Sequence, residues 1–409
     1  MSPRVDDPGL ISRRDFLRGG LLGGTALALA ACAPSVAPSV APPPSPSSGV
    51  AASATPSASA VTTPTPSPGP TLAAKIAGLI VVGFRGSTLT DAPWVATALR
   101  EGGLGGVILF DRDQLTGALR NVRSPNQVTT LVRDLRAAGG DRRIIVSVDQ
   151  EGGVVTRLSP AHGFPAVASQ ATIGRGTVAA ARTWGAGIAR TLATVGINLN
   201  FAPVVDLDVN PRSPAIGALG RSFSAQPAVV IEMASADIEA HHARDIRTTL
   251  KHFPGIGSAT TNTDFGVADV TKTWTTRELE PFRALIAAGS ADLVMAGHVV
   301  NGQLDPDHPA SLSKAVVTDL LRSQLGWDGI VVTDDLQAAA ITRAFGRDEA
   351  ILLALEAGND LLLLANQQAY APTVVDRVVA VVSRAVASGR LPEARIDEAW
   401  GRVQRLFGG

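Results

Sequence analysis

Short apolar runs alternate with segments of helical periodicity from about residue 72 to the end of the chain. The runs are 76–84, 106–110, 144–148, 197–207, 246–253, 293–300, 330–333 and 360–365. Each is nearly continuous in apolar, often β-branched residues, which is typical of strands that are covered on both faces. The pattern therefore predicts eight buried strands.

The segments between these runs carry helix signals. Ser124 and Pro125 can begin a helix whose apolar stripe reaches Gly139, and Thr275 with Glu278 forms a capping-box pattern. Eight βα units in about 340 residues predict an α/β protein with a single (β/α)8 barrel of the TIM type. A doubly wound sheet is the alternative, but no GxGxxG turn follows a strand where a nucleotide fold would need one.

The N-terminus has the pattern of an export signal. The sequence SRRDFL at 12–17 precedes an uncharged run, 19–31, which is too short for a permanent membrane helix and resembles a twin-arginine signal. The run ends in LAAC at 29–32, which resembles the lipobox of bacterial lipoproteins, and Cys32 is the chain's single cysteine. We expect residues 1–31 to be the signal peptide and Cys32 to be lipidated on the outer face of the cell membrane.

Residues 33–70 contain no charged side chain and consist almost entirely of Ala, Pro, Ser, Thr, Val and Gly. Such a composition cannot form a packed core, so we expect 32–71 to be the lipidated cysteine with a disordered linker and 72–409 to be the barrel domain. The chain has 36 basic and 36 acidic residues, which gives no field that would attract nucleic acid. We expect a monomer.

Polar residues collect where the predicted strands end, and active sites of (β/α)8 barrels lie at those carboxyl ends. They are Asp149, Asp206, Lys251, His252, His298, Asp334 and Asp335. No cysteine cluster, HExxH motif or phosphate loop accompanies them, so the sequence predicts neither a metal nor another cofactor.

Five motifs in order resemble glycoside hydrolase family 3, and in particular its single-domain β-N-acetylhexosaminidases. They read DQEGGVVTRL (149–158), NLNFAPVVD (198–206), GRSF (220–223), KHFPG (251–255) and GIVVTDDL (329–336). The resemblance implies that Asp334 is the catalytic nucleophile and Asp335 a structural neighbour. It also implies a set of residues that bind the sugar, which comprises Asp149, Arg157, Arg221, Lys251 and His252.

The loop after KHFPG departs from the family's pattern. The family usually has His-Gly after this motif and then Asp-Ser-His, whose last histidine is the acid/base. Here Ile256 replaces the first histidine, and Asn262 and Asp264 stand in the Asp and His positions. Apolar neighbours such as Phe265 could raise the pKa of Asp264 enough for proton donation at neutral pH, which is the interpretation we favour. The alternative is a site that only binds sugar.

The sequence therefore predicts an exported, lipid-anchored, retaining glycosidase. It would remove terminal β-linked N-acetylglucosamine from cell-wall or muropeptide-type glycans through a glycosyl-enzyme on Asp334. Three alternatives stay open: a sugar-binding surface lipoprotein without catalysis, a β-glucosidase of the same family and a glycoside phosphorylase.

Substitution Cys32→Ala tests the anchor. Because a lipidated cysteine would attach the chain to the membrane, the variant should be released or stay unprocessed when cells are fractionated, whereas the wild type sediments with membranes. A variant of mature size in the membrane fraction would contradict the prediction.

Overall fold

The computed structural model describes residues 69–262, 266 and 268–407. The predicted signal peptide, almost all of the predicted linker with Cys32, and Asp264 lie outside the described residues. The structure therefore does not test the predictions made for them.

Eight parallel strands form one sheet in the order β11-β9-β7-β6-β3-β2-β1-β12. Their bounds are β1 (Ile80–Gly83), β2 (Gly106–Leu109), β3 (Ile145–Val148), β6 (Leu199–Asn200), β7 (Arg247–Phe253), β9 (Leu293–Ala296), β11 (Ile330–Thr333) and β12 (Leu362–Leu364). A parallel bridge between Val332 and Leu361 joins the two ends of the sheet, so the predicted (β/α)8 barrel is confirmed.

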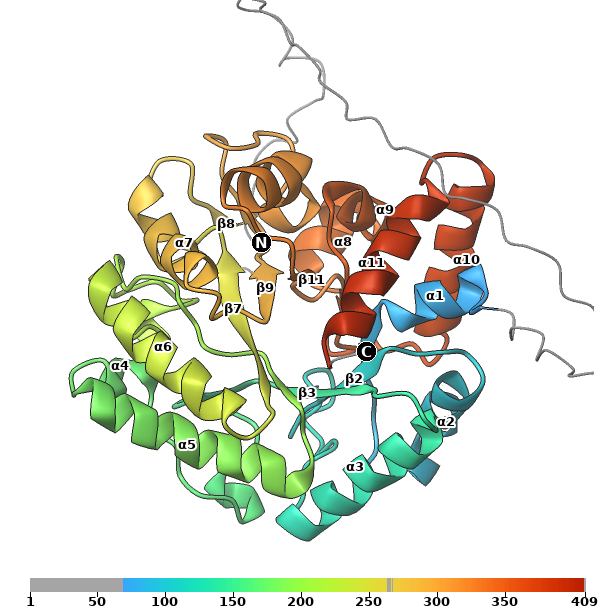
Figure 1. The fold of residues 1–409 in the computed structure, drawn as a ribbon, viewed down its shortest axis with the longest axis horizontal. Coiled ribbons are helices and arrows are strands. Elements are labelled where there is room, and N and C mark those ends of the chain that lie inside the picture. The colour runs from blue at the N-terminus through green and yellow to red at the C-terminus, as the bar shows by residue number, and fades with distance from the viewer. Residues whose placement is uncertain (1–68, 263–265, 267, 408–409) are drawn as a thin grey trace, which may run out of the picture. The chain divides into compact units, whose positions relative to one another are not determined.

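Helices surround the strands as a ring (Figure 1). They are α1 (Leu72–Gly78), α2 (Pro93–Arg100), α3 (Pro125–Gly139), α4 (Gln170–Ile173), α5 (Val178–Val195), α6 (Pro227–His242), α7 (Glu280–Ala287), α8 (Ala339–Phe345), α9 (Arg347–Ala357), α10 (Val374–Ala387) and α11 (Glu393–Arg405). Shorter or irregular helical segments are η1 (Leu89–Asp91), η2 (Pro160–His162), η3 (Gly217–Leu219), η4 (Thr276–Leu279), η5 (Ala310–Leu312) and η6 (Ala315–Gln324).

Two small sheets extend the ends of barrel strands. An antiparallel hairpin, β4 (Gln150–Gly152) with β5 (Val155–Thr156), follows β3 directly. A parallel pair, β8 (Ala268–Asp269) with β10 (Val299–Val300), lies beyond β7 and β9. Both small sheets lie at the end of the barrel that carries the carboxyl ends of its strands.

Three of the predicted apolar runs are only partly strand. The first run begins inside α1, whose N-terminus is capped by the Thr71 hydroxyl accepting from the Ala74 amide. The run 197–207 forms a named strand only at β6, and a single parallel bridge from Val204 to Lys251 follows Pro203, which has no N–H for a ladder. The run 293–300 is divided between β9 and β10. In these three runs the apolar pattern correctly predicted that the backbone is buried, but it did not predict which residues pair in the barrel sheet.

Helix α3 follows its predicted signals, but the start of α7 does not. The Ser124 hydroxyl accepts from the Gln127 amide at 3.3 Å, and the helix ends before Gly140, whose φ is +62°. The predicted capping box is wrong, because Thr275 makes no side-chain cap and Glu278 turns into the protein interior.

A buried charge cluster holds the helices to the N-terminal end of the barrel. Asp360, fully buried just before β12, accepts from Arg322 at 2.6 Å, Arg395 at 3.0 Å and Arg402 at 3.3 Å. Because η6 and α11 supply these arginines, one carboxylate joins both elements to the barrel. An uncompensated buried cation would be costly, so each arginine depends on this partner.

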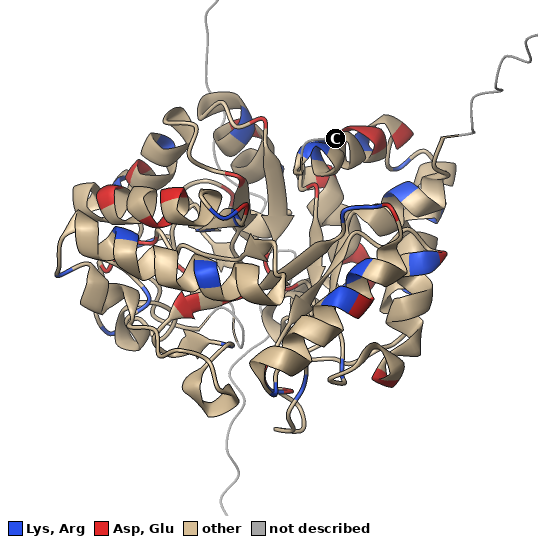
Figure 2. Cartoon of the chain, turned by 60° about the horizontal axis from the view of Figure 1, so that its bottom comes forward, with Lys and Arg blue, Asp and Glu red and all other residues tan. Residues whose placement is uncertain are grey.

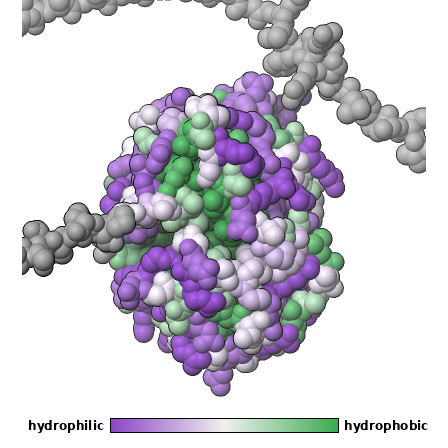
Figure 3. All heavy atoms as spheres, turned by 90° about the vertical axis from the view of Figure 1, so that its right-hand side faces the viewer, coloured by the Kyte–Doolittle hydropathy of each residue, from purple (hydrophilic) through white to green (hydrophobic). Residues whose placement is uncertain are grey.

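Basic and acidic residues are interspersed along the described helices and loops, and neither sign gathers on one side in the view of Figure 2. On the face to the right in Figure 1, hydrophilic residues surround a central strip of apolar ones (Figure 3). Within the described residues, no helix has the length and apolar character needed to cross a bilayer.

Candidate active site

A cavity of about 440 Å³ opens at the carboxyl ends of the barrel strands. Seven residues selected from the sequence line it, namely Asp149, Arg157, Arg221, Lys251, His252, Asp334 and Asp335. They come from the segments after β3, β6 and β11 and from the end of β7, so the fold brings together side chains that are up to 186 residues apart, from 149 to 335. Asp264 lies outside the described residues, but Asn262 of the same loop lines the cavity.

Lys251 is the buried cation at the centre of this wall. Its Nζ lies 2.8 Å from Asp149 Oδ1 and 2.6 Å from Glu151 Oε1, and its side chain is only 2% exposed. Burial lowers the pKa of Lys251, but the two carboxylates outweigh it and hold the pKa above its ordinary value. The ammonium is therefore charged throughout the neutral range.

Glu151 joins Lys251 to Arg221 and is the main site residue that the sequence analysis did not select. Arg221 Nε and Nη2 both donate to its carboxylate at 2.8 Å, in the bidentate arrangement that guanidinium groups favour. Burial raises the pKa of Glu151, but Arg221 and Lys251 together keep it far below its usual range. The signal was in the DQEGG motif, where Glu151 follows a strand end in the same way as Asp149.

Arg157 is held loosely by comparison. Its Nη1 lies 3.8 Å from Asp111 and its Nη2 4.0 Å from Asp149, while its guanidinium carbon lies 5.3 Å from the centre of the Phe110 ring. The side chain is 28% exposed. Arg157 can therefore donate to a ligand with little rearrangement.

His252 is oriented by Asp206, which the structure places behind the cavity wall. The fully buried Asp206 accepts from His252 Nδ1 at 2.7 Å and from the His252 amide at 3.0 Å through the same oxygen. The other ring nitrogen, Nε2, lies 3.4 Å from Arg221 Nη2 at the cavity. Asp206 thus fixes the ring without facing the ligand space.

Asp334 follows β11 and has one oxygen held by the backbone. The Asp335 amide donates to Asp334 Oδ1 at 2.8 Å, and the Asp334 amide donates to Ala296 in β9 at 3.0 Å. Burial raises the pKa of Asp334, but His298, His252, the Asp335 amide and Lys251 outweigh it and keep the pKa below its ordinary value. The carboxylate is ionised at neutral pH.

Two other predicted polar residues hold loops in place. The carboxylate of Asp335 accepts from the amides of Gln337 and Ala365, at 3.1 and 3.0 Å. His298 is buried between the Ser311 hydroxyl and the Asp335 carbonyl, at 2.7 and 2.8 Å. These contacts fit the structural part that the sequence analysis gave to Asp335.

The paired glycines of the DQEGG motif form a tight turn. Gly152 and Gly153 have φ values of +90° and +62°, which favour glycine. A Cβ on Gly152 would lie 2.2 Å from the carbonyl oxygen of Ala168, so the close approach is to the protein's own backbone. The turn is therefore sufficient to explain both glycines.

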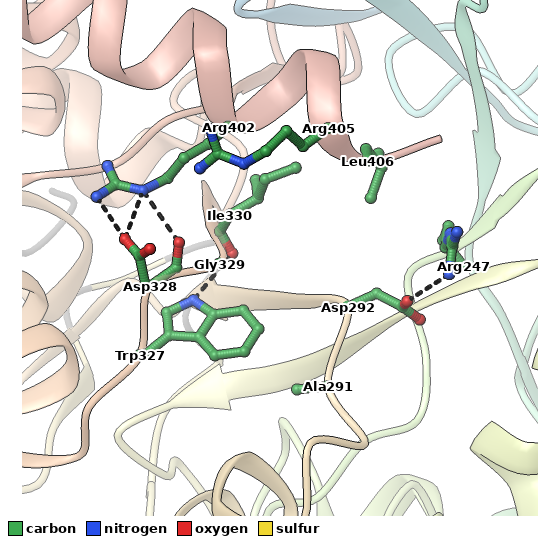
Figure 4. A pocket seen from close by; sticks show the side chains of 10 residues that line it. All are labelled: Arg247, Ala291, Asp292, Trp327, Asp328, Gly329, Ile330, Arg402, Arg405 and Leu406. Carbon is green, nitrogen blue, oxygen red and sulfur yellow. Dashed lines mark hydrogen bonds and ion pairs between the residues drawn. The ribbon is translucent and has the colours of Figure 1, made fainter. Parts of the chain in front are cut away.

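A second hollow of about 320 Å³ lies at the opposite, N-terminal end of the barrel (Figure 4). Two of its arginines are paired with carboxylates of the same hollow: Arg402 donates to Asp328 at 3.0 Å and Arg247 to Asp292 at 3.1 Å. This arrangement stabilises the barrel end, and the candidate site is the cavity at the carboxyl ends. Within the described residues, no group of three or more His, Cys, Asp or Glu side chains could hold a metal ion.

Comparisons with known proteins agree with the fold. The family model described as "Glycosyl hydrolase family 3 N terminal domain" matches residues 71–406. The chain belongs to this family of glycoside hydrolases.

Named relatives and solved structures are similar to this chain over most of the barrel. A beta-hexosaminidase of Tolumonas auensis is 36% identical over 284 residues, which cover 68% of this chain and 80% of the relative. The structure of a beta-N-acetylhexosaminidase from Beutenbergia cavernae has a TM-score of 0.75 at 32% identity and covers 83% of this chain and 99% of that one. A family 3 beta-N-acetylglucosaminidase from a Paenibacillus species has a TM-score of 0.75 at 33% identity, and the match covers 83% of this chain and 62% of that longer chain.

Substitution Glu151→Gln should lower kcat/KM for an aryl N-acetyl-β-glucosaminide by about 10- to 100-fold, mainly through KM. Removing the negative charge leaves Lys251 and Arg221 with weaker partners, and hydrogen bonds to charged groups contribute about 1.5–3 kcal/mol. Steady-state kinetics of the folded variant, checked by circular dichroism, measure the effect.

The matched control is Glu349→Gln, which removes an equivalent carboxylate that pairs with Arg390 on the exposed surface at 2.7 Å. It should leave the kinetics unchanged. Wild-type kinetic constants in Glu151→Gln would show that Lys251 and Arg221 do not need this partner.

Proposed function

We propose that the protein is a retaining glycosidase that hydrolyses terminal β-linked N-acetylhexosamine, with N-acetylglucosamine as the preferred sugar. The observation that carries the proposal is an ionised carboxylate, Asp334, in one cavity with a tightly paired group of cations and carboxylates. This is the combination of a negative charge for the anomeric carbon and polar groups for ring hydroxyls that glycoside hydrolysis needs. The names of the relatives support the choice of sugar.

The shape of the cavity supports cleavage at a chain end. Its floor consists of barrel residues such as Met295 and Leu363, which belong to β9 and β12. A pocket of about 440 Å³ closed by the barrel can enclose a terminal sugar, while the rest of a glycan stays outside. An enzyme with such a site removes one sugar at a time.

In the first step, a carboxylate oxygen of Asp334 bonds to the anomeric carbon as the glycosidic C–O bond breaks, and Asp264 gives its proton to the leaving oxygen. In the second step, Asp264 takes a proton from water, whose oxygen displaces Asp334 from the anomeric carbon. The sugar leaves with its original anomeric configuration, and both residues return to their starting states.

The remaining cavity residues position the sugar. Asp149 can accept from ring hydroxyls, because Lys251 donates to only one of its oxygens, Oδ1, at 2.8 Å. Arg157 and Arg221 both line the cavity and carry hydrogen-bond donors. His252 presents Nε2 toward Arg221 in an orientation set by Asp206, so the ring is fixed before a ligand arrives.

We also propose that the glycosidase acts outside the cell, attached through lipidated Cys32, on glycans of the cell wall. The support is the sequence alone: SRRDFL, the uncharged run that follows it and LAAC at 29–32. The uncharged linker, 33–70, would keep the barrel near the membrane at a reach of up to about 3 Å per residue.

Substitution Asp334→Asn should lower kcat for an aryl N-acetyl-β-glucosaminide by several orders of magnitude, because an amide cannot form the covalent intermediate. Asp335→Asn is the matched control, since asparagine can still accept from the Gln337 and Ala365 amides, and its loss should be far smaller. Steady-state kinetics of the two variants measure the two losses of kcat. A sugar-binding titration of Asp334→Asn shows whether that variant still binds its ligand. A wild-type protein that binds N-acetylglucosamine but hydrolyses no glycoside would support the binding-only alternative instead.

Substitution Asp264→Ala should reduce hydrolysis of a disaccharide far more than that of a dinitrophenyl glycoside, because only the poor leaving group needs a proton. Azide should restore turnover of the activated substrate by replacing activated water in the second step. An acid works only while protonated, so the alkaline limb of the wild-type pH profile should disappear in the variant. Equal losses on both substrates without azide rescue would remove Asp264 from proton transfer.

A further inference from the structure

A buried carboxyl group outside the cavity contacts the loop on which the proposed proton donor lies. Glu278, in η4, is 1% exposed and does not line the cavity. Its Oε2 accepts from the Ser258 amide at 3.3 Å. Ser258 belongs to the segment between the KHFPG motif and Asn262, so the contact is made at the base of that loop.

The turn at 255–259 is in close contact with its surroundings. Gly255 has a φ of +109°, and a Cβ there would lie 2.7 Å from Glu278 Cβ. A Cβ on Gly257 would lie 1.7 Å from the Leu207 carbonyl oxygen. The Ile256 amide donates to Asp206 Oδ1 at 2.8 Å. The turn therefore fits between Glu278 on one side and the Asp206–Leu207 segment on the other.

Glu278 has no cationic partner among the described residues. Its Oε1 and the neighbouring Ser258 Oγ are both buried without a hydrogen-bond partner in the described part of the chain. The segment 254–262 contains no ionisable side chain. The charged group that faces Glu278 across the turn is Asp206, whose carboxylate is already occupied by His252 and Ile256. On its own element, Arg277 and the following Glu280 are exposed.

These surroundings favour the neutral acid. Burial is the largest cause that raises the pKa of Glu278, to about 7, and Asp206 adds to it, while the backbone amides of Ser258 and Gly257 oppose it. A protonated carboxyl group can both accept from the Ser258 amide and donate a hydrogen bond, which an ionised one cannot.

We propose that Glu278 is a positioning residue, which as a neutral acid supports the 255–259 turn and so places the loop that supplies the proton donor. The inference rests on the proposed function and adds a residue that acts through that loop. It also explains why the pattern Thr275 with Glu278 does not cap a helix: the carboxyl group is directed into the protein toward the turn.

Kinetics of Glu278→Ala on two leaving groups test the positioning. A misplaced proton donor slows the reaction only when the leaving group needs a proton in order to depart. In Glu278→Ala, kcat/KM for a disaccharide should therefore fall by about 100-fold, and kcat/KM for a dinitrophenyl glycoside by no more than about threefold. Glu278→Gln keeps the size and neutrality of the side chain and should restore the ratio of the two rates. Glu280→Ala, an exposed change two residues on, is the control and should match the wild type.

If Glu278→Ala does not fold, Glu278→Asp takes its place, since the shorter side chain withdraws the same group from Ser258. Equal losses on both substrates, or a ratio that Glu278→Gln fails to restore, would overturn the inference while leaving the proposed function intact. A wild type that hydrolyses neither substrate would overturn the proposed function and the inference with it.

The pH dependence of stability tests the neutral state. The folded pKa, about 7, is above the ordinary value of 4.5, so the favourable contribution of Glu278 is present below the unfolded pKa and is lost as pH rises through about 7. Glutamine cannot ionise, so Tm of Glu278→Gln should rise relative to wild type between about pH 5 and pH 8. A Tm difference that is the same at both pH values would contradict a neutral Glu278.

Discussion

The candidate site depends on one buried ammonium group. Lys251 is almost fully enclosed and lies within 2.8 Å of two carboxylates, and removing either partner would leave a buried charge in part uncompensated. Through Glu151 the same constraint extends to Arg221, since one carboxylate serves both cations. The polar wall of the cavity is therefore a connected set of charges whose positions fix one another, and such a set can bind hydroxyl groups without first rearranging.

The barrel makes this arrangement possible because the carboxyl ends of its parallel strands all lie at the same face. Lys251 and His252 come from the last residues of β7, and Asp334 follows β11. Buried acidic residues behind the cavity wall support this face, as Asp206 does for the His252 ring and, in our proposal, the neutral acid Glu278 does for the 255–259 turn. The charge cluster around Asp360 holds η6 and α11 to the other end of the barrel.

The sequence was sufficient for the barrel and for most of the cavity, because strand ends can be read from where apolar runs stop. It could not show which polar residues face the ligand space. Asp206 and His298 follow the same rule as Asp149, yet both lie behind the wall, since the direction of a side chain depends on loops far away in sequence. Glu151 and Glu278 were missed for the same reason: their partners, Arg221 and Ser258, are 70 and 20 residues away.

The central claim is that Asp334 forms a covalent bond to the sugar, and trapping that bond tests it most directly. A 5-fluoro N-acetylglucosaminyl fluoride slows the second step more than the first, so the wild-type enzyme should accumulate the labelled intermediate. Tryptic digestion yields the peptide 323–343, which contains Asp334, and fragmentation in the mass spectrometer should place the added sugar on that residue. A label on another carboxylate, or continued turnover without any labelled protein, would contradict the account.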